Sequence, residues 1–271
     1  MRFFDDVKAY VHYAIYSAKA ELKAEVSNSY LNCLWWILDP LLFMLVYSFV
    51  VSIVFGSSED NLLVFVFIGL TLWTFFSKVL TASVDLVVKR KSIITRIYVP
   101  KFVFLFSKMF VHFFKMCISL ILVFILMIIS GVPFTWQIFN LIPIFITLSV
   151  VCFGFSTILM HLGVFVGDFK NIVTVVLKLF FYMSGVFYSI EGRIAASLKR
   201  FFSEEISNSV GFMLLKVNPI AFLIDQTRTI LIDGTNPDYL LISVWLVIGL
   251  ILSVIGINLI YKYENTYVKV I

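Results

Sequence analysis

Residues 31–40 read Leu-Asn-Cys-Leu-Trp-Trp-Ile-Leu-Asp-Pro, and they join a charged, amphipathic stretch to a long apolar one. After Pro40 the next charged residue is Glu59. A helix needs roughly 20 apolar residues to cross the hydrocarbon core of a bilayer. This junction therefore predicts the point at which a helix on the membrane surface gives way to a helix that crosses the membrane.

The composition of the whole chain is that of an integral membrane protein. Of its 271 residues, 61% are hydrophobic and 14% are charged, and the mean hydropathy is +1.03. A water-facing domain of this size could not bury so much apolar surface. The net charge is +5, but the basic residues cluster between apolar runs, where they set membrane orientation. Nucleic-acid binding is therefore not expected.

Neither a metal site nor a nucleotide-binding site is expected. The three cysteines, Cys33, Cys117 and Cys152, lie in or beside apolar stretches and have no metal-ligand spacing. The chain contains no G-x-x-x-x-G-K-[ST] loop that could hold a nucleotide phosphate. Charged residues interrupt the first thirty positions, so we expect targeting by the first spanning helix rather than by a cleaved signal peptide.

The apolar runs predict an all-α fold with six transmembrane helices, because only fully hydrogen-bonded backbones cross a bilayer. Residues 1–30 are expected to form an amphipathic interfacial helix, and residues 31–271 the transmembrane domain. The six spans are predicted at about residues 34–55, 62–83, 102–130, 138–165, 170–189 and 239–261.

Lys and Arg are concentrated before the first span and in residues 84–101, and they are absent from the turns at residues 56–61 and 131–137. Cytoplasmic loops hold the excess of Lys and Arg, so both chain ends are predicted to be cytoplasmic. The loop at residues 190–238 also carries basic residues, but long loops follow this rule weakly.

Three segments are predicted to be neither spans nor plain loops. In residues 1–30 apolar side chains recur every three or four positions, which indicates a helix on the membrane or against a soluble partner. Residues 89–101 predict a short cytoplasmic helix or an ordinary basic loop, with a new helix starting after Pro100. In the loop at residues 190–238, which is predicted to lie outside the cell, Asn218-Pro219 predicts the start of a helix and Gly234 predicts its end. Earlier in the same loop, residues 194–215 suggest short re-entrant helices.

Four motifs follow one another along the chain: residues 29–40, residues 67–76 (Phe-Ile-Gly-Leu-Thr-Leu-Trp-Thr-Phe-Phe), residues 96–101 (Arg-Ile-Tyr-Val-Pro-Lys), and residues 217–219 with Arg228 and the turn at residues 234–237. Their sequences and their order resemble those of the permease subunit of ABC-2 type exporters for lipid-linked polysaccharides, O-antigens, capsules and teichoic acids. The chain differs from that family at Asn32, where glycine is usual, at Asp39, where asparagine is usual, and at Gly167, where an arginine often precedes Asp168.

The resemblance implies that two copies of this chain form a pore in the bacterial cytoplasmic membrane. It also implies two ATPase subunits beneath the pore, which would bind ATP and Mg, with no cofactor on this chain. The basic segment before the third span is our candidate for the helix that docks on the ATPase. Its predicted coupling residues are Lys89, Arg90, Lys91, Ile94 and Arg96.

Ionisable and aromatic residues within the spans are candidates for the substrate path. Lys108, His112 and Lys115 form one stripe of the third span, and an ionisable group in a span normally faces a partner or a water-filled path. The alternative is that the lysines snorkel to the headgroups, and that the aromatic rings anchor the helices at the interface. The predicted path residues are Lys108, Lys115, Lys178, Phe181, Tyr182 and Tyr188.

Other readings stay open at this point. Gly163 and Gly167 fit the close-packing pattern of membrane helices and suggest a dimer contact. A drug or small-lipid exporter of the same architecture, a channel, and a membrane transferase acting on lipid-linked sugars are the rival functions. Catalysis is not expected, because the acidic pairs fall in predicted loops or helix surfaces and the three histidines are scattered.

Overall fold

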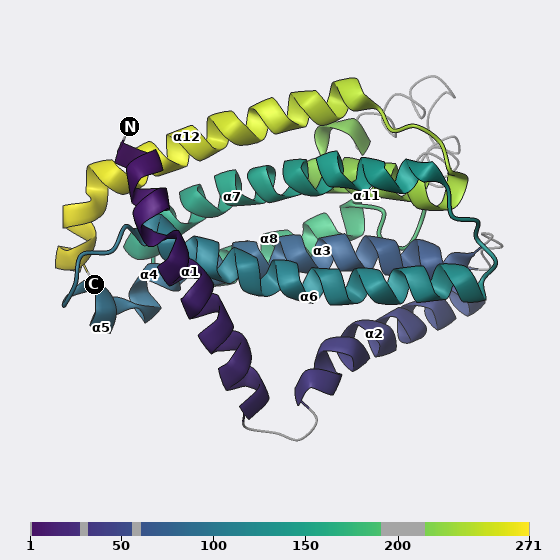
Figure 1. Cartoon of the computed structure of the whole chain (residues 1–271), viewed down its shortest axis with the longest axis horizontal. Helices are drawn as coiled ribbons and strands as arrows, with labels where there is room; N and C mark the ends of the chain where they lie inside the picture. Colours follow the sequence, from purple (N-terminus) through teal and green to yellow (C-terminus); the bar gives the residue numbers. More distant parts are fainter. Residues whose placement is uncertain (1, 28–31, 56–60, 191–214, 271) are drawn as a thin grey trace.

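The computed structural model describes residues 2–27, 32–55, 61–190 and 215–270, and none of these residues forms a strand. The prediction of an all-helical protein is confirmed. Most helices run along one long axis, and the first helix, α1 (Arg2–Ser27), crosses the others at a steep angle (Figure 1). The predicted turn at residues 56–60 and the predicted re-entrant helices at residues 194–214 lie outside the described residues.

Four helical segments are long and apolar enough to cross a membrane. Helix α3 lies centrally, and α6, α7, α2, α8 and α11 all pack against it. Its burial from Val64 to Val84 follows from this position. The four segments are α3 (Leu62–Val84), α6 (Lys101–Ile129), α7 (Leu141–Phe165), which continues the 3-10 turn η1 (Trp136–Asn140), and α12 (Tyr239–Val270).

Two further apolar helices lie where spans were predicted, namely α2 (Asn32–Phe55) and α8 (Phe169–Met183). Helix α8 is shorter than the predicted span, which extended to residue 189. It ends where Gly185 turns the chain with a φ of +61°, a conformation that glycine adopts readily. The 15 residues of α8 are fewer than the roughly 20 that a span needs, so the count of six spans stays a prediction.

The end of α3 leads into two single-turn helices, α4 (Leu86–Lys89) and α5 (Lys91–Ile94), which Arg90 separates. The start of α1 and the end of α12 lie at this same end of the bundle (Figure 1). We call this end the α4–α5 end. At the opposite end α11 (Pro219–Arg228) starts with the Asn218 side chain accepting hydrogen bonds from the Ile220 and Ala221 amides, at 3.2 and 3.4 Å.

The predicted start of α11 is thereby confirmed, since Asn218 is its N-cap and Pro219 its first residue. The helix continues as one π-helical turn, η3 (Thr229–Asp233), and Gly234 ends it in the left-handed conformation. Helix α6 likewise begins directly after Pro100.

Gly163 allows α7 to touch the end of α3. A Cβ atom at this position would lie 2.0 Å from the Val84 carbonyl oxygen, whereas a Cβ at Gly167 would meet nothing within 4 Å. Gly163 therefore packs within the chain, and this contact positions the residues that follow Val84 at the α4–α5 end.

We predict that Gly163→Ala lowers the thermal stability of the purified chain, because a methyl group there must push α7 away from α3. Overpacking of this kind costs about 1–3 kcal/mol. Thermal unfolding in detergent, followed by size-exclusion chromatography, measures the effect. Gly167→Ala is the matched control and should unfold at the wild-type temperature; equal temperatures for all three proteins would contradict the packing described.

Candidate functional site

A buried arginine joins three segments at the end of the bundle opposite α4 and α5. Arg228, at the end of α11, donates hydrogen bonds to the carbonyl oxygens of Phe65 (3.1 and 3.2 Å), Gly185 (2.9 Å) and Val186 (2.7 Å). Its guanidinium carbon also lies 3.5 Å from the centre of the Phe65 ring. The five donors of a guanidinium suit several carbonyls at once, so Arg228 fixes the turn after α8 against the start of α3.

Gly69 makes room for this arginine. A Cβ atom at Gly69 would lie 2.7 Å from Nη2 of Arg228 and 2.9 Å from the Val186 carbonyl oxygen. Two of the motifs that carry the family resemblance, residues 67–76 and the segment around Arg228, thus meet in space. The motifs alone gave no sign that they are in contact.

Aromatic rings pack α2, α3 and α8 together beside this turn. Tyr47 stacks on Phe187 with ring centres 4.2 Å apart, and Phe181 lies 5.0 Å from Phe187 and 5.3 Å from Trp73. Of the predicted path aromatics, Phe181 is part of this cluster. Tyr182 is exposed, and the Tyr188 hydroxyl donates to its carbonyl oxygen.

Lys178 lies on an exposed, mostly apolar face of α8. Among the described residues it has no ion pair or hydrogen bond, and its neighbours Val175, Leu179 and Tyr182 on that face are 58–62% exposed. Large exposed apolar surfaces are normally covered by lipid or by another chain. A lysine on such a surface needs a polar neighbour from outside the described chain or a path to water.

Lys108 and Lys115, by contrast, are paired with carboxylates of α1. Lys108 forms an ion pair with Glu21, and Lys115 lies 2.7 Å from Glu25. His112 stands between the two lysines on α6 and is half-buried. The structure thus brings the two predicted path lysines of α6 against α1; their role in the path stays a prediction.

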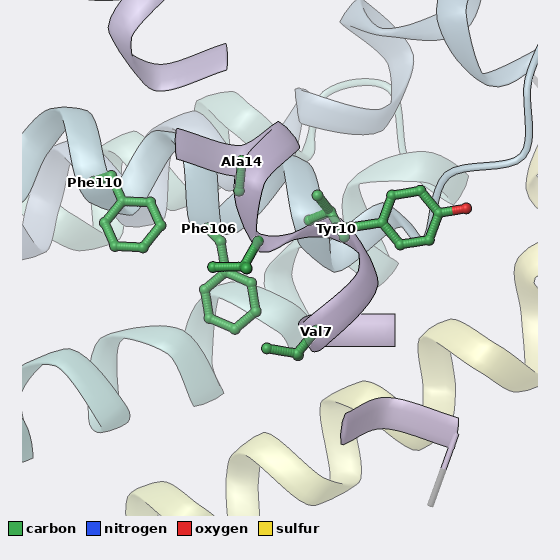
Figure 2. Close-up of a pocket in the computed structure, with 7 residues that line it drawn as sticks. Val7, Tyr10, Ala14, Phe106 and Phe110 are labelled. Carbon is green, nitrogen blue, oxygen red and sulfur yellow. The ribbon is translucent and has the colours of Figure 1, made fainter. Parts of the chain in front are cut away.

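The contact between α1 and α6 is apolar nearer the α4–α5 end. A pocket of about 90 Å³ there is lined by Val7, Tyr10, Val11, Ala14, Val103, Phe106 and Phe110 (Figure 2). The Tyr10 hydroxyl points away from it, toward the Tyr98 carbonyl oxygen at 3.3 Å. With no polar group aimed into it, this pocket offers nothing that could bind a sugar or a phosphate.

The predicted coupling residues occupy different positions around α4 and α5. Ile94 is buried, whereas Lys91 and Arg96 are exposed. Arg90 faces α1, with Nη2 3.7 Å from Glu21. Lys89 lies 2.9 Å from the Asp85 carboxylate, which also receives a 2.6 Å hydrogen bond from Lys170 at the start of α8.

Asp85 therefore links α3, α4 and α8. Burial alone would raise the pKa of the Asp85 carboxyl, but the hydrogen bonds from Lys170 and Lys89 outweigh it and lower the pKa below its ordinary value. Because the folded-state pKa is depressed, Asp85 contributes stability above its unfolded pKa and loses that contribution as the pH falls through the folded value.

The start of α1 is fastened at the same end. Arg2 donates to the Tyr98 hydroxyl at 2.6 Å and to the Glu264 carboxylate at 2.8 Å, and the Tyr261 hydroxyl donates to Asp6 at 2.6 Å. These bonds tie α1 to α12 and to the segment that precedes α6.

We predict that Asp85→Asn loosens the α4–α5 segment, because Lys89 and Lys170 lose their shared anion. Amide hydrogen exchange of residues 86–97 should become faster, while global stability falls by no more than about 1 kcal/mol, as expected for partly exposed ion pairs. Asp168→Asn, at an exposed carboxylate at the start of α8 without an ion pair among the described residues, is the control. Faster exchange in both variants, or in neither, would contradict the role of Asp85.

This architecture, with long apolar helices, an amphipathic helix packed across them and a basic segment at one end, is that of a multi-pass membrane protein. Comparison with known families agrees: the sequence matches the ABC-2 type transporter family over residues 15–201. The chain belongs to that family.

Similar proteins of known description extend the match to nearly the whole chain. It is 26% identical over 255 residues to the O-antigen export system permease protein RfbA of Klebsiella pneumoniae, covering 93% of this chain and 92% of that protein. It is also 26% identical over 219 residues to the O-antigen export system permease protein RfbA of Myxococcus xanthus, covering 80% and 79%.

Sequence reasoning missed the acidic partners on α1. Glu21 and Glu25 are spaced four residues apart, so they share a face of α1. Charged residues of an amphipathic helix are ordinarily assigned to its solvated face. The available signal was the presence of two lysines within a span, each of which requires a counter-charge.

Proposed function

We propose that this chain is the transmembrane permease subunit of an ATP-driven exporter for a lipid-linked polysaccharide or a teichoic-acid-type polymer. The observation that carries the proposal is the end-to-end similarity to O-antigen export permeases. In the proposed assembly two copies of the chain form the pore in the bacterial cytoplasmic membrane. Two separate ATPase subunits bind ATP and Mg at its cytoplasmic side.

The α4–α5 end is the proposed cytoplasmic, motor-facing end. Support comes from its basic residues, which cytoplasmic loops favour, and from the start of α1 and the end of α12, which lie there (Figure 1). Lys91 and Arg96 lie on the exposed surface of this segment, where acidic groups of an ATPase would approach, while the buried Ile94 and the Asp85 ion pairs anchor the segment to the bundle. Force on this segment would then reach α3 and α8.

We expect the double change Lys91→Glu and Arg96→Glu to abolish copurification of the ATPase or its stimulation by cargo, because charge reversal repels an acidic docking surface. The ATPase rate of the reconstituted complex measures this. Lys262→Glu, at an exposed position on the same end of the bundle, is the control and should leave the rate unchanged. A wild-type rate in the double variant would remove the docking assignment.

The proposed substrate path follows α8. Lys178, Tyr182 and Tyr188 supply a cation for phosphate and rings for sugar faces, and Phe181 orders the aromatic cluster behind them. The exposure of the α8 face supports this proposal, since a pore-lining surface is left open in a single copy of a pore-forming pair.

We expect Lys178→Met to lower the amount of polymer at the cell surface by about tenfold or more, without lowering the amount of permease in the membrane, because the path loses its cation. Lys178→Arg keeps the charge and should export normally. Normal export by Lys178→Met would exclude a cation requirement at this position.

Comparing lipid-linked glycan, drug and small-lipid cargoes for stimulation of ATP hydrolysis would decide the cargo class.

A further inference from the structure

The two ion pairs between α1 and α6 belong to one cluster of charges. Glu21 is shared by Lys108 and by Arg90, the latter at 3.7 Å, and Glu25 lies 2.7 Å from Lys115. All five side chains are at least partly withdrawn from solvent, with 21–36% of each exposed. We call these five residues the seam cluster.

Trp36, at the start of α2, completes the surroundings of the cluster. Its indole Nε1 donates to Glu25 at 3.1 Å, and the Lys115 ammonium lies 5.6 Å from the centre of its ring. The cluster thus joins four elements: α1, α2, α6 and, through Arg90, the α4–α5 segment. Any change in the pairing of Glu25 alters the environment of this tryptophan.

The two carboxylates of the cluster neither balance the charge of its three cations nor meet all of their hydrogen-bonding capacity. Three cations face two anions, which leaves a formal excess of one positive charge. The buried Oε2 atom of Glu21 has no hydrogen-bond partner among the described residues, and the Arg90 guanidinium makes no hydrogen bond within the same part of the chain. A buried, unpaired polar atom is costly, so a ligand that engaged the guanidinium fork would bind better than Glu21 does.

The position of the cluster on α6 sets the chemistry of such a ligand. Lys115 lies about 21 Å along α6 from its first residue, at about 1.5 Å per residue, and the surrounding helix is apolar. Charges at this depth need counter-charges. Arginine and lysine together favour phosphate, which the guanidinium binds through two parallel hydrogen bonds and the ammonium binds as a point charge.

We propose that Arg90, Lys108 and Lys115 form a binding site for the phosphate-bearing head of a lipid, which Glu21 and Glu25 occupy when no lipid head is bound. Glutamates one turn apart on a helix present two carboxylates to neighbouring cations, much as a diphosphate presents two phosphates. Binding of the head displaces these carboxylates and frees this part of α1 from α6. The inference builds on the proposed function, in which the cargo is lipid-linked.

Displacement of the Glu21 and Glu25 carboxylates would also change contacts at the motor-facing end. Arg90 lies between α4 and α5, so its transfer from Glu21 to a phosphate changes the contact between α1 and the proposed docking segment. A loaded site thereby differs from an empty one at the surface where the ATPase is proposed to bind.

The alternative is a purely structural latch, in which the acids and bases hold α1 in place and bind nothing. The binding site and the latch predict different changes in ligand affinity when the acids or the bases are removed. For a binding site, removing the acids removes a competitor and tightens binding, whereas removing the bases weakens it. For a latch, changes on either side weaken the same contact and have no opposite effects on ligand affinity.

The test uses the full chain in phosphatidylcholine nanodiscs, with geranylgeranyl diphosphate as the probe and empty nanodiscs as the blank. Affinity is measured by tryptophan fluorescence and, independently, by equilibrium dialysis. We expect Glu21→Gln with Glu25→Gln to bind roughly tenfold more tightly and Lys108→Met with Lys115→Met at least about tenfold more weakly, which corresponds to 1.4 kcal/mol per factor of ten. Each single variant, and its thermal stability, is measured alongside.

Matched controls come from ion pairs outside the cluster. Glu264→Gln removes an acid that pairs with Arg2, and Lys170→Met removes a base that pairs with Asp85; neither should change the affinity for the probe. Lys108→Arg with Lys115→Arg keeps both charges and should retain binding, which separates loss of charge from loss of folding.

Four results would overturn the proposal: unchanged affinity in the glutamine variants, unchanged affinity in the methionine variants, equal binding of geranylgeraniol, or equal binding of inorganic pyrophosphate. The last would assign the site to soluble phosphates instead of lipid heads. The assay contains no ATPase and no polymer. A failure of the proposed transport function would therefore show in the ATPase and export measurements, and a failure of the lipid-head site in this one.

Discussion

An ionised side chain beside apolar helices must find a partner, because the low-polarity surroundings do not solvate it. Three sites in this protein meet that requirement in different ways. Lys108 and Lys115 take carboxylates from α1, Arg228 takes backbone carbonyls from α3 and from the turn after α8, and Asp85 takes two lysines. Each site fastens a peripheral element to the central helices.

Helix α3 connects two of these sites. The Phe65 carbonyl, near its start, accepts from Arg228, and Asp85 follows its last residue and holds Lys89 and Lys170. Helix α8 also meets both sites, since Lys170 is in its first turn and Gly185 follows its end. Helices α3 and α8 therefore both connect the α4–α5 segment to the turn at Gly185. Under the proposed function, this connection is the route by which a displacement of the α4–α5 segment would reach that turn.

Much of the fold follows from local sequence signals. Apolar runs indicate the long helices, Pro100 indicates where α6 starts, and Asn218, Pro219 and Gly234 mark the ends of the helix that includes α11. These signals act over a few residues, through capping, backbone restriction and hydropathy. The all-helical class was for this reason predictable from the sequence, whereas the family was predicted from the resemblance of four motifs and their order.

The partners of the charged residues were not predictable in the same way. Lys108 and Glu21 are 87 positions apart, and Arg228 and Gly185 are 43 apart, so no local pattern records either contact. The early end of α8 depends on the turn at Gly185, which Arg228 holds from another segment. Sequence shows that a charge within a span needs a partner, but only packing decides which one it receives.

Paired charges hold α1 against α6. We would exchange the charges of one pair and measure thermal stability for Glu25→Lys, Lys115→Glu and the double variant. We expect each single variant to be destabilised and the double variant to recover much of the loss, because the pair is restored in reverse. If the double variant lost as much stability as the two single variants together, the two side chains would not stabilise each other and α1 would be held in another way.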